Sequence, residues 1–118
     1  MKPVVIIIQQ KAISWNKLYS SPHWSIRAKI AKEWHELVYW TCQQQMIRKN
    51  IGKGVDIEVI AYCKGKLLDP DNICSAKLII DGLKKADIIG DDTPEWVKSV
   101  TTRCLKAKTD YIKVVITR

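Results

Sequence analysis

The sequence predicts an α+β fold, in which one small domain packs a mixed β-sheet against two main helices. Residues 3–10 and 55–62 are rich in β-branched residues, as strands are. Residues 26–41 and 73–83 instead repeat apolar side chains at helical spacing. The resulting order of elements is strand, helix, strand, helix, strand, strand, without repeats or linkers. A chain of 118 residues that is 47% apolar can bury one ordinary core, so residues 1–118 are expected to form a single domain.

The N-terminal segment is predicted to be a buried strand and not a targeting sequence. Its apolar run covers only Val4–Ile8, and no small-residue cleavage site follows. No apolar run approaches the roughly 20 residues that a membrane span needs. We therefore expect a cytoplasmic protein that does not associate with membranes.

The first long helix is predicted to begin at Ser21-Pro22, where a capping hydroxyl precedes a proline suited to the first turn. Its apolar positions, including Trp34, recur at helical spacing, and the helix is expected to end before Gly52. A helix of roughly 25 residues is long for a small domain. Part of it is thus free to pack on a second subunit.

The second half of the chain is predicted to hold the remaining elements. Asp69-Pro70-Asp71-Asn72 forms a loop that opens a helix ending near Ala86, and residues 90–94 form a turn. Residues 96–105 and 111–117 are predicted to pair as a β-hairpin around residues 108–110.

The charge of the chain is unevenly distributed. Its formal net charge is +8, yet residues 69–95 hold seven acidic residues against three lysines, and the remainder holds 17 basic residues against five acidic ones. A basic body attracts phosphates, and a concentrated acidic segment can hold a cation. Metal-dependent nucleases need both properties. A basic protein with one solvated acidic loop is the simpler alternative.

The cysteines and histidines favour structural roles. Cys42, Cys63, Cys74 and Cys104 are widely spaced and form no C-x-x-C pair, which argues against zinc and favours buried thiols. His23 and His35 are expected to be structural residues of the first helix.

The acidic segment carries the candidate chemistry. Pro70 stiffens the chain between Asp69 and Asp71, so two carboxylates are presented near a helix start. Carboxylates held close together repel unless a cation lies between them, and Mg²⁺ or Mn²⁺ is bound in this way. Asp91-Asp92 supplies a third carboxylate if the chain returns after the helix. Each motif also has a simple structural interpretation, as a capped turn, a polar turn or a surface ion pair.

Taken together, these motifs resemble the RusA family of Holliday-junction resolvases. The run is Asp69-Pro70-Asp71-Asn72, then Lys77, then Asp81-Gly82-Leu83, then Ile89-Gly90-Asp91-Asp92. The resemblance covers about 24 residues closely. It implies that Asp69, Asp71 and Asp92, with Asp91 adjacent, bind the metal and that Lys77 is the essential lysine. The spacing from Asp71 to Lys77 is two residues longer than in the family's best-known pattern.

The expected function is therefore a Mg²⁺-dependent endodeoxyribonuclease that resolves four-way DNA junctions by paired symmetric nicks. Asp69, Asp71, Asp92 and Lys77 are the expected catalytic residues, without an organic cofactor. The resemblance also implies a homodimer, whose twofold symmetry supplies two cutting sites on branched DNA. The residues expected to contact DNA are Lys11, Lys17, Arg27, Lys64 and Lys66. Two alternatives remain open: a nuclease for forks, flaps or duplex, and a non-catalytic DNA-binding module.

Overall fold

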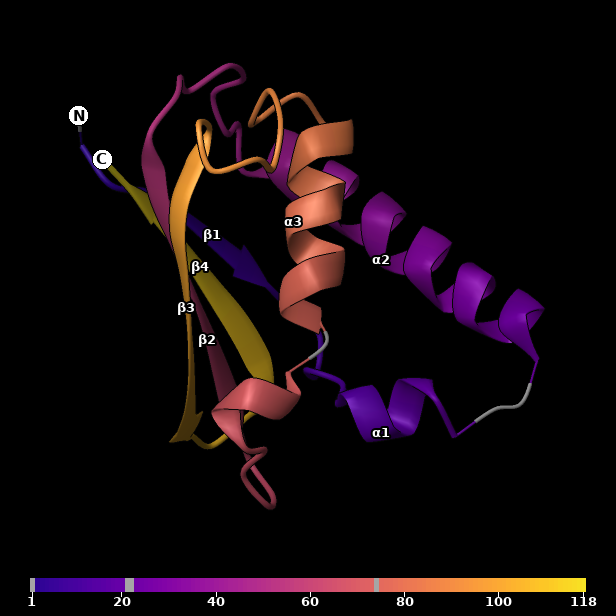
Figure 1. The fold of residues 1–118 in the computed structure, drawn as a ribbon. Helices are drawn as coiled ribbons and strands as arrows, with labels where there is room; N and C mark the ends of the chain where they lie inside the picture. The colour runs from indigo at the N-terminus through magenta and orange to yellow at the C-terminus, as the bar shows by residue number, and fades with distance from the viewer. Residues whose placement is uncertain (1, 21–22, 74) are drawn as a thin grey trace.

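The fold consists of one four-stranded sheet and a layer of helices (Figure 1). The computed structural model describes residues 2–20, 23–73 and 75–118. In chain order the elements are β1 (Val4–Ile8), α1 (Trp15–Leu18), α2 (Trp24–Gln44), β2 (Val55–Cys63), the short 3₁₀ helix η1 (Pro70–Asn72), α3 (Ser75–Lys85), β3 (Val97–Lys106) and β4 (Tyr111–Thr117).

The sheet is mixed, with the strand order β1-β4-β2-β3. β4 pairs antiparallel with both β1 and β2, whereas β3 pairs parallel with β2. This arrangement confirms the predicted α+β fold class with a mixed sheet and helices.

The predicted β3–β4 hairpin is wrong, because β2 lies between the two strands. The short connection after β3 does reverse the chain, but it crosses the end of β2 on its way to β4. It is held there by two hydrogen bonds. The Ala107 N–H donates to the Cys63 carbonyl (3.0 Å), and the Lys64 N–H donates to the Asp110 carboxylate (2.9 Å).

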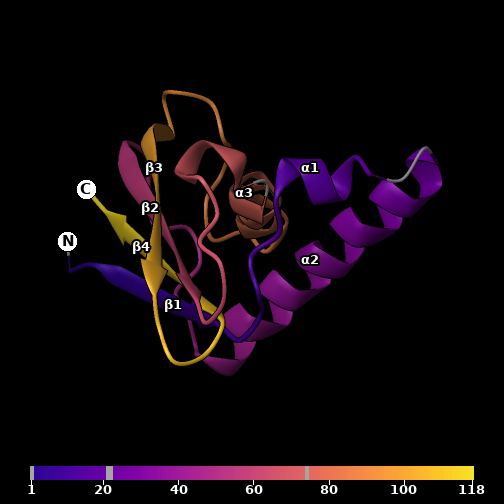
Figure 2. The ribbon, with the colours of Figure 1, turned by 90° about the horizontal axis from the view of Figure 1, so that it is seen from below.

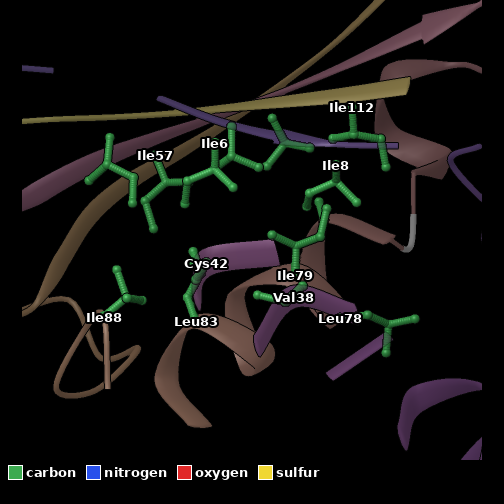
Figure 3. Packing of buried hydrophobic residues seen from close by; sticks show 14 of the residues in the cluster. Ile6, Ile8, Val38, Cys42, Ile57, Leu78, Ile79, Leu83, Ile88 and Ile112 are labelled. Atoms are coloured by element: carbon green, nitrogen blue, oxygen red, sulfur yellow. The ribbon is translucent and has the colours of Figure 1, made fainter. Parts of the chain in front are cut away.

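All helices lie on the same side of the sheet (Figure 2), and the core fills the space between the layers (Figure 3). The strands alternate, so that Ile6 and Ile8 of β1 and Ile112 of β4 point inward and are fully buried. They meet apolar side chains of α2 and α3, including Val38 and Leu83.

The two long helices approach closely at Gly82 of α3. A Cβ atom placed on Gly82 would lie 2.9 Å from Cβ of Val38 in α2. The missing side chain therefore allows α3 to lie against α2.

The two edges of the sheet differ. At β1, the side-chain amide of Gln45 accepts a hydrogen bond from the Ile7 N–H (3.0 Å) and donates one to the Ile7 carbonyl (2.6 Å). This amide takes the place of a neighbouring strand for that residue. At the other edge, residues 98–101 of β3 are exposed.

The helices agree with the sequence except near α1 and the start of α2. α1 was not predicted, and α2 begins at Trp24 with His23 as its cap, two residues after the predicted Ser21-Pro22 start, which lies outside the described residues. Trp34 is 5% exposed, as expected of a core residue. Within the described part of the chain, no helix combines the length and apolar character needed to cross a membrane.

Candidate functional site

The first pair of aspartates lies in η1 and the residue before it. Asp69 is extended (φ −65°, ψ 135°) and caps η1, while Pro70 occupies the first turn, where its fixed φ suits a helix start. Asp71 follows within η1 and is exposed. The hydroxyl of Thr102 in β3 donates to the Pro70 carbonyl (2.7 Å), so both aspartates are anchored to the edge strand of the sheet.

A cavity of about 340 Å³ lies between α3 and the N-terminal half of β3. Its polar groups are Lys77 and Asp81 of α3 together with Asp92 from the loop after α3. Its apolar lining includes Ile73, Ile80, Val97 and Val100. This space, named here the α3–β3 cavity, brings two of the predicted site residues, Lys77 and Asp92, around one concave surface.

Lys77 and Asp81 lie one helical turn apart and form an ion pair with 3.4 Å between Nζ and Oδ2. The Lys77 side chain is 61% exposed and that of Asp81 is 28% exposed. The ammonium group therefore lies at the mouth of the cavity, where solvent and a bound anion can both reach it.

Asp91 and Asp92 are joined by a residue that sequence reasoning did not single out. Nζ of Lys84 lies 3.1 Å from Asp91 and 3.8 Å from Asp92. The Asp91 carboxylate also accepts a hydrogen bond from the Asp92 N–H (2.8 Å). This backbone hydrogen bond and Lys84 lower the pKa of Asp91, and the hydrogen bond to Asp91 raises the pKa of Lys84. Asp91 thus contacts Lys84 of α3 and the backbone of its own loop, whereas Asp92 also lines the α3–β3 cavity.

Asp69 lines a second cavity of about 470 Å³, with Lys11, Lys66, Asn16 and Asn72 among its neighbours. Two of the lysines expected to contact DNA, Lys11 and Lys66, therefore flank a predicted metal ligand. Such a surface combines positive charge for phosphates with a carboxylate oxygen for a cation.

The two aspartate pairs lie on opposite sides of α3 in the sequence, before and after a helix whose 11 residues span about 16 Å. The α3–β3 cavity lies between them, because it contacts Ile73 just after η1 and Asp92 in the returning loop. After α3 the chain turns back, so that Asp92 reaches the α3–β3 cavity. Across residues 2–20, 23–73 and 75–118, no three histidine, cysteine or acidic side chains are close enough together to hold a metal ion.

The remaining predicted residues lie as follows. Lys17 is an exposed residue of α1, and the guanidinium group of Arg27 lies 5.1 Å from the ring centroid of Tyr19. Lys64 is exposed, and its backbone is fixed by Asp110.

The chemistry of the cysteines and His35 agrees with structural roles. Cys42 and Cys63 are buried thiols, while Cys104 is half-buried and Cys74 lies outside the described residues. Nε2 of His35 is buried without a hydrogen-bond partner among the described residues. Burial, and then the charge of Lys85, lower the pKa of His35 and favour its neutral form.

No family model and no curated protein sequence matches the chain. The candidate site is therefore defined by its own residues: Lys77, Asp81 and Asp92 around the α3–β3 cavity, and Asp69 and Asp71 at η1, where Asp69 lines the second cavity.

Proposed function

We propose that this protein is a metal-dependent endodeoxyribonuclease that resolves four-way DNA junctions. The observation that carries the proposal is the convergence of Lys77, Asp81 and Asp92 on one cavity, in a chain of net charge +8. The motif resemblance supports the choice of reaction, and the cavity supports it by grouping Lys77 with two carboxylates.

The donor set fits Mg²⁺ or Mn²⁺. The groups near the cavity that can bind a cation are carboxylates, and hard divalent ions prefer oxygen ligands. Mg²⁺ is commonly held by one or two carboxylates, with water and substrate phosphate completing its shell, so a triad within the chain is not required. The motif resemblance assigns the ion to Asp69, Asp71 and Asp92, with Asp91 adjacent, and of these Asp92 would contribute its oxygen from the wall of the α3–β3 cavity. When bound, such an ion supplies an activated water and charge stabilisation for phosphodiester hydrolysis.

The protein's own residues would bind and orient the scissile phosphate. Lys77 would offset the negative charge that develops on the phosphate, since it lies at the cavity mouth and is more than half exposed. Lys84 would hold the Asp91-Asp92 loop against α3 and so fix the direction of the Asp92 carboxylate.

A four-way junction needs two symmetric nicks, and we propose that a homodimer in the cytoplasm supplies them. The N-terminal half of α2 extends beyond the sheet layer in Figure 1, which leaves surface for a second copy. A nuclease that prefers forks, flaps or duplex is the second candidate, because the cavity and its charges serve any phosphodiester.

The deciding experiment is a gel assay with a four-way junction, a fork and a linear duplex of matched length, each in Mg²⁺ or EDTA. We expect Mg²⁺-dependent paired nicks in the junction. Asp92→Asn should abolish cleavage, because it removes the negative charge of a metal ligand. Junction binding should persist, because the basic surface is unchanged.

Asp87→Asn is the matched control. It makes the same change of charge at an exposed residue with φ 60°, a conformation that asparagine tolerates well. It should cut at the wild-type rate. Cleavage by Asp92→Asn at that rate would remove Asp92 from the site, and faster cutting of the fork or the duplex than of the junction would favour the second candidate. If the wild-type protein binds junctions but cuts nothing in Mg²⁺ or Mn²⁺, it is a binding module.

A further inference from the structure

An aromatic cluster that the proposed chemistry does not use lies at the junction of α1 and α2. The rings of Trp15 and Tyr19 are stacked, with centroids 5.8 Å apart and an angle of 16° between their planes. The guanidinium group of Arg27 lies 5.1 Å from the Tyr19 centroid. Tyr19 nevertheless stays 60% exposed, and Trp24 nearby in the sequence is 74% exposed. We call Trp15, Tyr19 and Arg27 the aromatic cluster.

The local sequence explains why the two rings stack. The Ser14 side chain accepts a hydrogen bond from the Lys17 N–H (3.0 Å) and so caps α1, and the Tyr19 N–H donates to the Trp15 carbonyl (2.9 Å). One helical turn therefore separates the two aromatic residues and places them on the same face.

The cluster is fixed relative to the candidate active site. Trp15 lines the α3–β3 cavity together with Lys77 and Asp92. Ser14 forms an isolated β-bridge with Ile73, which connects the start of α1 to the chain entering α3. The stacked rings thus lead from the wall of the cavity to an exposed surface.

The surrounding chain is purely cationic. Residues 2–32 contain six basic residues and no acidic one, the first acid being Glu33. Lys17 lies within α1 itself and is exposed. Exposed aromatic rings among cations are the combination with which proteins bind single-stranded nucleic acid, since cations follow the phosphates and rings stack on bases.

We propose that the aromatic cluster stacks on unpaired bases of a DNA strand whose phosphates reach the α3–β3 cavity. In duplex DNA the bases stack on one another and are not available to these rings. A strand with unpaired bases offers both a backbone for the cations and base faces for Tyr19. The choice of DNA rests on the proposed function, but the prediction concerns binding and does not require cleavage.

The test is fluorescence anisotropy in EDTA, with a labelled 20-nucleotide oligothymidine and a 20-base-pair duplex as probes. Tyr19→Ala should weaken binding of the oligothymidine about fivefold or more, because stacking on one base contributes roughly that factor at the least. The same variant should change duplex affinity by less than about twofold. Tyr19→Phe keeps the ring and should bind both probes like the wild type.

One further variant serves as a control for the loss of an exposed ring. Trp40→Ala removes a 65% exposed tryptophan from the C-terminal half of α2 and should affect neither probe.

The proposal is overturned if Tyr19→Ala weakens both probes equally, if it weakens neither, or if the wild-type protein does not bind oligothymidine. The base-stacking proposal and the nuclease proposal can each fail without the other. A selective loss in a protein that cuts no DNA supports the aromatic cluster and refutes the nuclease, whereas unchanged oligothymidine binding in an active nuclease does the reverse.

Discussion

Replacing Lys77 with methionine separates a structural lysine from a functional one, because the two roles differ greatly in energy. The Lys77–Asp81 pair has a 3.4 Å separation and a 61% exposed lysine side chain. A solvent-exposed pair of this kind contributes about 0.3–0.5 kcal/mol. Its loss should therefore lower the melting temperature by less than about 3 °C.

The effect on cleavage should be much larger. A cation that offsets charge developing on the scissile phosphate typically accounts for a hundredfold or more in rate. We expect Lys77→Met to reduce the single-turnover rate on a four-way junction by at least about that factor, with junction affinity nearly unchanged. The assay is rapid mixing with excess enzyme and saturating Mg²⁺.

Lys85→Met is the control, since Lys85 lies on the same helix and is exposed. Lys85→Met should leave the cleavage rate within about twofold of the wild-type rate. A surface lysine that interacts only with a neighbouring charge or with the helix dipole takes no part in the chemical step. A two- or threefold effect of Lys77→Met would show that the lysine only pairs with Asp81. The longer spacing from Asp71 would then mark a real departure from the family's pattern.

Three other measurements test the fold and the basic surface. Gly82→Ala should lower the free energy of unfolding in urea by about 1–2 kcal/mol, since the clash with Val38 outweighs the gain in helix propensity; an unchanged midpoint would contradict the close helix contact. Burial raises the pKa of Cys42 to about 11, so the thiol is protonated below that pH, and peptide mapping after iodoacetamide treatment at pH 8 should find it alkylated only in the unfolded protein. Junction affinity should fall with salt by a log–log slope of about −0.9 per phosphate contact, and a flat titration would refute the phosphate-binding surface.

The elements with a clear period were predictable from sequence. The apolar stripe of α3 shows by its spacing which face is buried, and the continuous β-branched run of β1 indicates a strand without showing its buried face. α1 was missed because four residues show no period. Its one signal is Ser14, a capping residue before the short helix.

The strand pairing was not predictable from the same information. The connection at residues 107–110 reverses the chain as a hairpin turn would, but whether β4 pairs with β3 or passes to the far side of β2 depends on partners some 50 residues away. The sequence of the turn does not indicate which of these two strand pairings forms.

The candidate site likewise contains contacts that local spacing predicts and contacts that depend on the path of the chain. Lys77 and Asp81 form the pair that helical spacing predicts, since four residues on a helix fix a distance. The contact of Lys84 with Asp91 depends on the path of a returning loop, and the sequence contains only the two opposite charges. That Asp69 lies in a different cavity from Asp92 likewise follows from where β3 places η1.

The strand order also constrains how the chain can fold. β4 follows the other strands in the sequence, yet it lies between β1 and β2 in the sheet. β1 therefore stays separate from β2 and β3 until residues 111–117 pair with both β1 and β2. The β1–β4 pairing closes a loop of about a hundred residues, and such non-local pairings slow folding toward the millisecond-to-second range. A chain shortened before Tyr111 would leave β1 without a neighbour, with its inward isoleucines exposed. Folding intermediates that lack β4 should therefore be those most prone to aggregate.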